Sequence, residues 1–205
     1  MDTIGDALLI LGVAGVGKST VGRHCALRWP AKRYVDVGTI REMLRPQHPE
    51  LALSTYGVWR LVADQPTPGY LARGFERYAE VLWPAVTRFL QWTAQEGNNL
   101  VLDGAMMSPR LVGGIRIDGL RVHPRMLRLS DPAAHLQRLR SSVRPGSRQE
   151  RRLVESFPLV RALQDYLEKE CRVREIPVLE NEDLEETLAR ILGSLARAAL
   201  EIGDE

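Results

Sequence analysis

Apolar runs alternate with helical periodicities along the chain. A continuous apolar run from Ala7 to Val13 and a second one at Asn99–Gly104 predict strands buried on both faces of a parallel sheet. Shorter strands are predicted at Arg33–Val37, Arg125–Leu129 and Ile176–Leu179. Helices are predicted between them, at Lys18–Arg28, Thr39–Arg45, Tyr70–Glu96, Pro132–Val143, Leu153–Cys171 and Asp183–Ile202. This alternation predicts a three-layer α/β fold with a central parallel sheet, in a single domain over residues 1–205.

Local signals predict where several elements begin, bend or end. Ser54 is expected to cap a helical stretch, and Asp131 to cap the helix that begins at Pro132. Pro84 is expected to kink the long helix. The polar, glycine-containing segment Arg144–Arg152 is predicted to be a loop between two helices.

The segment that joins the first strand to the first helix carries a specific pattern. Residues 12–19, GVAGVGKS, satisfy G-x-x-x-x-G-K-[ST] directly after an apolar strand and before a helix. In this pattern, backbone N–H groups turn towards phosphate oxygens, the lysine reaches the β- and γ-phosphates, and the serine hydroxyl completes a Mg²⁺ shell. The sequence therefore predicts a nucleotide-binding P-loop. Its residues are Gly12, Gly15, Val16, Gly17, Lys18, Ser19 and Thr20.

Two features after the P-loop favour a small-molecule kinase. Asp103 ends the apolar strand LVLD, where its carboxylate would hold the Mg²⁺ shell with Ser19 or orient an acceptor. The segment Arg144–Arg152 is expected to be a lid, whose Arg144 and Arg148 stabilise the transferred phosphoryl group. A turn-forming aspartate and a solvated basic loop remain as the alternatives. The base-reading motif N-K-x-D of GTPases does not occur, and 205 residues leave little room for an AAA-type ATPase with its lid domain.

The charge distribution is informative mainly in one segment of the chain. The net charge is +2, yet residues 105–152 contain 11 basic and 3 acidic residues. A basic segment in a nearly neutral chain indicates a local anionic ligand and argues against a nucleic-acid track. Of the 28 basic residues only three are lysines, and one of these is Lys18. For most of the arginines, the codon preference of a GC-rich genome is a sufficient explanation.

Composition places the chain among ordinary globular proteins with a sizeable core, at 44% hydrophobic and 26% charged residues. Cys25 and Cys171 lie far apart and have no partners at metal-ligand spacing, which indicates a reducing compartment. The run Ala7–Val13 is too short to span a membrane. We therefore expect a cytoplasmic protein without a membrane segment, as a monomer or homodimer.

Beyond the P-loop, the sequence resembles the 2-phosphoglycerate kinase family of P-loop kinases over nearly its whole length. The matching segments are GTIREMLRP (38–46), PELALSTYGVWRL (49–61), GFERYAEVLWPAVTRFL (74–90), EGNNLVLDGAMMSP (96–109), RLVESFPLVRALQDYLEKE (152–170) and IPVLEN (176–181). The resemblance implies a fold like that of nucleoside and shikimate kinases. It also implies transfer of the γ-phosphoryl group of ATP, with Mg²⁺, to a small acceptor that is already anionic.

The sequence departs from this family at two positions. Gly38 stands where the family carries an aspartate, and Met106 replaces a histidine that members often have. Strand periodicity places positions 36 and 38 on the same face about 7 Å apart, so Asp36 is a candidate to supply the missing carboxylate to an acceptor of different shape. The identity of the acceptor therefore stays open.

The resemblance also suggests roles for residues outside the P-loop. Arg41 is expected to grip an anionic group of the acceptor, and Asp36 or Asp103 to orient its hydroxyl. Asn181 and Arg138 are candidates for contact with the nucleotide, although Asn181 is equally well explained as the N-cap of the last helix. The Ser54–Tyr56 triplet is a candidate lining of the acceptor pocket. Two other functions stay open, a polynucleotide or nucleoside 5′-hydroxyl kinase and a regulatory or toxin-type nucleotide-binding protein.

Overall fold

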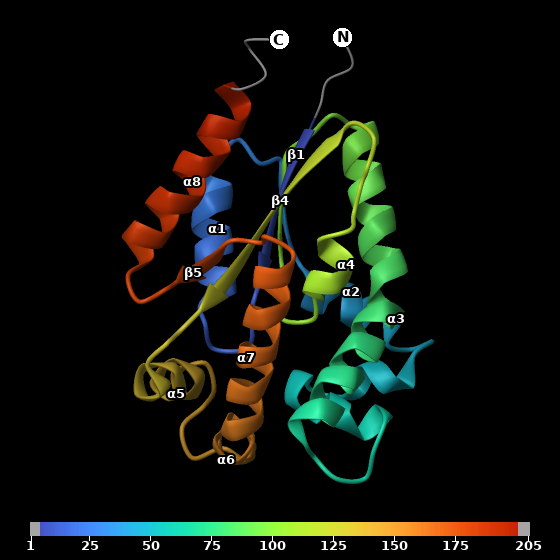
Figure 1. Ribbon diagram of the computed structural model, residues 1–205, viewed down its shortest axis with the longest axis vertical. Coiled ribbons are helices and arrows are strands. Elements are labelled where there is room, and N and C mark those ends of the chain that lie inside the picture. Colours follow the sequence, from blue (N-terminus) through green and yellow to red (C-terminus); the bar gives the residue numbers. More distant parts are fainter. Residues whose placement is uncertain (1–4, 201–205) are drawn as a thin grey trace.

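The computed structural model describes residues 5–200, and within this range the chain forms one five-stranded sheet. All pairings are parallel, and the strand order is β2-β3-β1-β4-β5 (Figure 1). The strands are β1 (Gly5–Leu11), β2 (Arg33–Asp36), β3 (Leu100–Asp103), β4 (Leu120–Arg128) and β5 (Val178–Glu180). The predicted α/β class with a central parallel sheet is confirmed.

Helices cover both faces of this sheet. The helices α1 (Lys18–Arg28) and α8 (Leu184–Leu200) pack together on one face, and α3 (Pro68–Gln95) and α7 (Phe157–Val173) pack together on the other (Figure 1). The remaining helical elements are α2 (Val37–Leu44), η1 (Pro49–Ala52), η2 (Thr55–Leu61), α4 (Pro109–Val112), α5 (Pro132–Ser141) and α6 (Arg148–Glu155). The predicted long helix is α3, which continues through Pro84.

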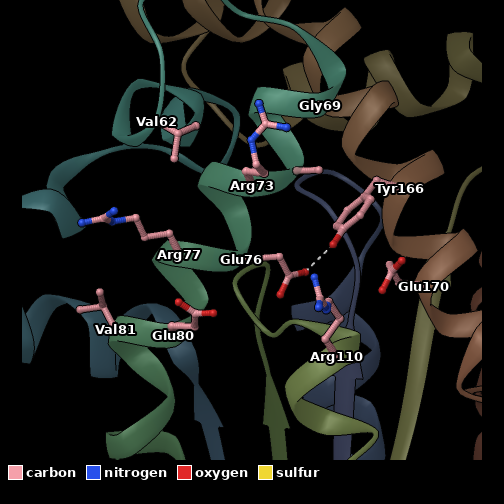
Figure 2. A pocket seen from close by; sticks show the side chains of 11 residues that line it. Val62, Gly69, Arg73, Glu76, Arg77, Glu80, Val81, Arg110, Tyr166 and Glu170 are labelled. Atoms are coloured by element: carbon pink, nitrogen blue, oxygen red, sulfur yellow. Dashed lines mark hydrogen bonds between the residues drawn. The ribbon is translucent and has the colours of Figure 1, made fainter.

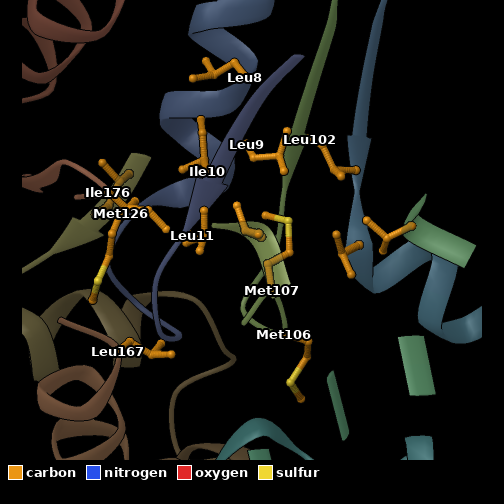
Figure 3. Packing of buried hydrophobic residues seen from close by; sticks show 14 of the residues in the cluster. Leu8, Leu9, Ile10, Leu11, Leu102, Met106, Met107, Met126, Leu167 and Ile176 are labelled. Carbon is orange, nitrogen blue, oxygen red and sulfur yellow. The ribbon is translucent and has the colours of Figure 1, made fainter. Parts of the chain in front are cut away.

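The core is centred on β1, whose residues 7–11 are completely buried. Side chains alternate between the two faces of a strand. Leu8 and Ile10 accordingly lie on the side of α1, whereas Leu9 and Leu11 lie on the side of Met107 (Figure 3). The unbroken apolar run was thus a sufficient signal for the central strand, because both of its faces are covered.

Strand β4 begins five residues earlier than the sequence predicted. It pairs with β1 from Leu120 to Met126, whereas β5 pairs only with Met126–Arg128. The first part of β4 therefore pairs on one side alone, and a strand edge without a partner tolerates a proline such as Pro124. This part of the strand was not predicted because its sequence, RVHPR, contains no apolar run.

The segment Arg144–Arg152 was predicted to be a loop, and this is wrong for its second half. Helix α6 begins at Arg148, because Ser147 accepts a hydrogen bond from the amide of Glu150 at 3.1 Å and Glu150 accepts one from the amide of Gly146 at 2.6 Å. This S-x-x-E pattern is close to a capping box and was visible in the sequence. The helix predicted at Leu153–Cys171 is instead divided between α6 and α7, and Pro158, which has no N–H to donate, lies in the first turn of α7.

The structure also shows how Ser54 and the two cysteines are placed. Ser54 is the N-cap residue of η2, but its side chain makes no capping hydrogen bond. Cys25 and Cys171 are both buried, and burial raises the pKa of each thiol to about 12, so that neither is a reactive nucleophile. Across residues 5–200, no helix is both long enough and apolar enough to cross a membrane.

A substitution at Gly74 would test how tightly α3 packs on η2. A Cβ atom at this position would lie 2.1 Å from the carbonyl oxygen of Val58, whereas at Gly69 the nearest atom would be the mobile end of Arg73 at 3.7 Å. Gly74→Ala is therefore expected to lower the free energy of unfolding by about 2 to 3 kcal/mol, and Gly69→Ala to change it by less than about 1 kcal/mol. Urea denaturation of both variants checks this, and equal effects would contradict the packing described.

Candidate active site

The loop between β1 and α1 turns on glycines with left-handed backbone angles. Gly12, Gly15 and Gly17 have φ values of 138°, 84° and 87°. A Cβ atom at Gly12 would lie 2.5 Å from the carbonyl oxygen of Leu127, and one at Gly17 would lie 2.5 Å from Nδ2 of Asn181. Both the backbone conformation and the close neighbours therefore require glycine at these two positions.

Three carbonyl oxygens of this loop are held by side chains from three different elements. Lys18 Nζ donates to the carbonyl of Val13 at 2.8 Å, and Nδ2 of Asn181 donates to that of Val16 at 2.7 Å. His135 Nε2 lies 2.8 Å from the carbonyl oxygen of Ala14, to which it donates because a carbonyl can only accept.

The amide groups of the same loop stay available. Within residues 5–200, the N–H groups of residues 13–17 donate to no protein acceptor. Free amides at the start of a helix attract anions, because they add to the positive end of the helix dipole. The loop thus has the geometry of a phosphate cradle.

Lys18 is buried in this cradle, with 8% of its surface exposed. Burial lowers the pKa of its ammonium group to about 8, against the opposing attraction of the Asp103 and Asp36 carboxylates. A lysine with this pKa remains mostly protonated at neutral pH. The positive charge of Lys18 therefore lies next to the free amide groups.

Ser19 and Asp103 connect the P-loop to β3. Ser19 Oγ donates to Oδ2 of Asp103 at 2.9 Å, while Oδ1 of Asp103 is buried and has no hydrogen-bond partner among the described residues. Burial raises the pKa of Asp103, although the hydroxyl groups of Tyr34 and Ser19 and the charge of Lys18 act against this. A hydroxyl oxygen beside a carboxylate with one free oxygen is a donor set that suits Mg²⁺, which prefers hard oxygen ligands and keeps several waters.

Asp36 lies beside Asp103, because the two residues are register partners in the parallel strands β2 and β3. A hollow of about 330 Å³ opens next to Asp36 and is also lined by Ser19, Arg23 and Tyr34. The P-loop serine and both predicted carboxylates therefore meet at the carboxyl end of the sheet, where ligands bind in open α/β folds.

The expected geometry of positions 36 and 38 was wrong. β2 ends at Asp36, which is the N-cap of α2 and accepts a hydrogen bond from the amide of Gly38 at 2.9 Å. Gly38 therefore lies in the first helical turn and does not share a strand face with Asp36. A Cβ atom at position 38 would lie 2.7 Å from Oδ2 of Asp36, so a larger residue there would require the side chain of Asp36 to shift.

His135 of α5 was not found from the sequence, although it is one of the closest contacts of the P-loop. Its ring is fully buried, stacks edge-on against Phe157, and accepts a hydrogen bond at Nδ1 from Arg161 at 3.3 Å. The partners at the two ring nitrogens fix the neutral tautomer with the proton on Nε2. Burial also lowers the pKa of His135, and the nearby charges of Arg161 and Lys18 add to the effect. No pattern in the sequence marks this position.

Asn181 lies against the P-loop, but it does not cap the last helix. That role belongs to Asp183, whose Oδ1 accepts a hydrogen bond from the amide of Glu186 at 2.8 Å. Arg138 donates to the carbonyl oxygens of Asn181 and Glu182 at 2.6 and 2.7 Å, so its guanidinium group ties α5 to the turn after β5.

The remaining predicted residues lie further from the cradle or on its rim. The guanidinium group of Arg41 pairs with Glu42 at 2.6 Å, and Thr20 is exposed on the first turn of α1. Arg144 is exposed in the turn before α6 and Arg148 is exposed at the start of this helix, and neither forms an ion pair with any residue in the described range. The Ser54–Tyr56 triplet lies at the start of η2.

Comparison with known proteins shows which sequences and folds this chain resembles. No protein-family model matches the chain. The 2-phosphoglycerate kinase of Methanocaldococcus jannaschii is 28% identical over 190 residues, which cover 90% of this chain and 61% of that protein. The 2-phosphoglycerate kinase of Pyrococcus horikoshii is 28% identical over 204 residues, which cover 95% of this chain and 65% of that protein. The resemblance found in the sequence is thus confirmed, and the chain spans less than two thirds of the length of these relatives.

Solved structures agree on the fold. A gluconokinase from Sinorhizobium meliloti matches with a TM-score of 0.54 at 18% identity, over 98% of this chain and 97% of that one. A shikimate kinase from Acinetobacter baumannii in complex with shikimate matches with a TM-score of 0.50 at 16% identity, over 94% of this chain and 96% of that one. The chain therefore has the P-loop kinase fold that the sequence resemblance implied.

The buried neutral His135 makes stability depend on pH. Its pKa is lowered from 6.5 in the folded state, so below about pH 6.5 the unfolded chain binds a proton that the folded chain resists. The contribution of His135 is thus fully present above pH 6.5 and is lost as the pH falls towards the lower folded pKa. His135→Gln, which can keep both hydrogen bonds, is expected to lose less stability than the unsubstituted protein between pH 7 and pH 5. Thermal melts at both pH values measure this, and an equal loss would contradict the neutral buried state.

Proposed function

We propose that the protein is an ATP-dependent kinase that transfers the γ-phosphoryl group to a hydroxyl of a small anionic metabolite. The observation that carries the proposal is a phosphate cradle with free amides, a buried lysine, and a serine bridged to the aspartate at the end of β3. The names of the relatives support a kinase and make 2-phosphoglycerate the first acceptor to test.

In this proposal, Lys18 leaves the carbonyl of Val13 and turns to the phosphate oxygens when nucleotide binds. Its ammonium group then neutralises the charge that develops on the transferred phosphoryl group. The amides of residues 13–17 bind the β-phosphate from the other side. Holding the loop carbonyls in place is the task of His135 and Asn181, which therefore act as positioning residues.

Ser19 and Asp103 would hold Mg²⁺, because their oxygens already lie 2.9 Å apart and one oxygen of Asp103 has no other partner in residues 5–200. When bound, this ion supplies charge neutralisation and orientation at the β- and γ-phosphates. Asp103 is thereby occupied, so orienting the acceptor hydroxyl falls to Asp36. Only one oxygen of Asp36, Oδ1, is engaged in capping α2.

The segment from Arg144 to Arg152 would act as the lid. Arg144 and Arg148 are exposed and carry no ion pair within the part of the chain that the structure describes, so their guanidinium groups are available to a phosphoryl group. Closing this segment over the cradle would exclude water and complete the site.

A screen for phosphoryl transfer tests the proposed function. ATP and Mg²⁺ are offered together with phosphoglycerates, sugar acids, nucleosides, aminoglycosides or 5′-hydroxyl oligonucleotides, and phosphorylated products are identified by mass spectrometry. Transfer to a small anionic acceptor is the expected result. Transfer to oligonucleotides alone, or nucleotide binding without transfer to any acceptor, would contradict the proposal.

Lys18→Ala is expected to reduce the rate of phosphoryl transfer by a factor on the order of 10² to 10³, while the protein stays folded. Lys32→Ala is the matched control, because Lys32 lies 3.8 Å from Glu96 in a surface ion pair away from the cradle. ADP release at saturating acceptor measures the rates, and circular dichroism monitors the fold. Undiminished transfer by a folded Lys18→Ala protein would rule out the assigned mechanism.

Asp36→Asn and Asp103→Asn are expected to change different kinetic constants. Asp103→Asn should raise the Mg²⁺ concentration needed for half-maximal rate, since it removes the charge of an expected ligand of the ion. Asp36→Asn should lower kcat and raise the KM of the acceptor, with the KM of ATP unchanged. Kinetics with each component varied in turn distinguish the two, and the reverse pattern would exchange the roles of the carboxylates.

A further inference from the structure

An open groove of about 850 Å³ lies between α3, α4 and α7 (Figure 2). This volume suits a small metabolite. Charged side chains line most of the groove. Arg73, Glu76, Arg77 and Glu80 come from α3, Arg110 comes from α4, and Glu170 comes from α7.

The floor of the groove is built around Glu76. Its Oε2 accepts a hydrogen bond from Ser108 Oγ at 2.6 Å, and its Oε1 accepts one from the hydroxyl of Tyr166 at 2.7 Å. Ser108 is completely buried, so this network ties α3 to the loop after β3 and to α7. Both oxygens of Glu76 are therefore engaged, and its position is fixed.

Arg73 and Arg77 remain available to a ligand, whereas Arg110 lies against Tyr166 and Glu76, which raise the pKa of its guanidinium group. Arg73, Arg77 and Arg110 form no ion pair with any residue between 5 and 200, whereas Glu170 is paired with Arg174 at 2.8 Å. Arg73 lies over the ring of Tyr70 at 4.5 Å, a contact that leaves its N–H groups free to donate. In Figure 2 the guanidinium group of Arg110 lies beside Glu76, and the side chains of Arg73 and Arg77 extend away from it.

From this arrangement we propose that the groove binds a small acid anion that also carries hydroxyl groups. Guanidinium groups donate paired hydrogen bonds to a carboxylate or phosphate. A carboxylate that lacks an ion-pair partner, such as that of Glu80, accepts hydrogen bonds from hydroxyl groups. A lining that mixes both groups discriminates against a ligand that has only one of these features.

The acceptor of the proposed reaction is a molecule of this chemistry, and its assignment to the groove rests on the proposed function. The groove is connected to the phosphate cradle by the loop after β3, because Ser108, which holds Glu76, lies five positions after Asp103. A chain of that length spans at most about 18 Å. Asp103 of the cradle and Ser108, which holds Glu76 of the groove, therefore lie within that distance of each other.

Direct binding tests the groove independently of catalysis. 2-Phosphoglycerate, inorganic phosphate and glycerol are each titrated into the full chain by calorimetry. The same titrations are made with Arg73→Ala, Arg77→Ala and Arg110→Ala. Arg88→Ala is the control, since Arg88 is exposed on the same helix outside the groove. Lys18→Ala is included because a phosphate can also occupy the P-loop.

We expect 2-phosphoglycerate to bind more tightly than phosphate and glycerol not to bind. Each groove variant should weaken the binding of 2-phosphoglycerate tenfold or more, while Arg88→Ala and Lys18→Ala leave it unchanged. Absence of binding, equal binding by all variants, or loss in Lys18→Ala alone would overturn the proposal.

A kinetic measurement then separates the acceptor from a second, non-reacting anion. If the groove holds the acceptor, the groove variants raise its KM tenfold or more without changing the KM of ATP. If the anion binds in the groove and the variants leave the acceptor KM unchanged, the groove is a site for a separate anion and its assignment to the acceptor is wrong. If the anion binds but no acceptor is ever phosphorylated, the proposed function fails while the anion site stands.

Discussion

Three hydrogen bonds to the backbone carbonyls of the P-loop are the constraint on which the rest of the site depends. A loop that turns on left-handed glycines has little conformational preference of its own. The donors are Lys18, His135 and Asn181, which belong to α1, α5 and the turn after β5. They reach one loop because β4 pairs with β1 and β5 pairs with β4, so that the segments leaving these parallel strands lie at the same edge of the sheet.

Electrostatics gives this cradle its selectivity for anions. Burial works against the charges of Lys18 and Asp103, lowering one pKa and raising the other, and the two opposite charges partly offset this cost for each other. Free amides and a buried ammonium group favour a bound phosphate. The free oxygen of Asp103 remains a position for a cation. This arrangement fits the proposed binding of an anionic nucleotide together with a metal ion.

The sequence predicted the parts whose signal is local. An unbroken apolar run was sufficient for β1, and the spacing of glycines, Lys18 and Ser19 was sufficient for the P-loop. Asp36 and Asp103 were both named from the sequence as candidates to orient the acceptor hydroxyl, but their side-by-side placement comes from the pairing of β2 with β3. The inferences for β1 and the P-loop depend only on neighbouring residues.

Contacts between distant segments were not predictable in this way. His135 lies 121 residues from the carbonyl that it binds, and no spacing in the chain marks it. The groove at Glu76 likewise depends on Ser108 and Tyr166, which only tertiary packing brings together. The misplaced Gly38 and the missed start of α6 have a different cause, because both depend on capping hydrogen bonds that compete with the simpler patterns of strand and loop.

The most direct test of the account is an NMR titration of the ¹⁵N-labelled protein with ADP and Mg²⁺. The free amides of residues 13–17 are the predicted phosphate ligands, so their resonances and that of Ser19 should shift more than those of any other loop. Large shifts confined to other regions, with the resonances of residues 13–17 unchanged at saturation, would contradict the central claim that this loop is the nucleotide site.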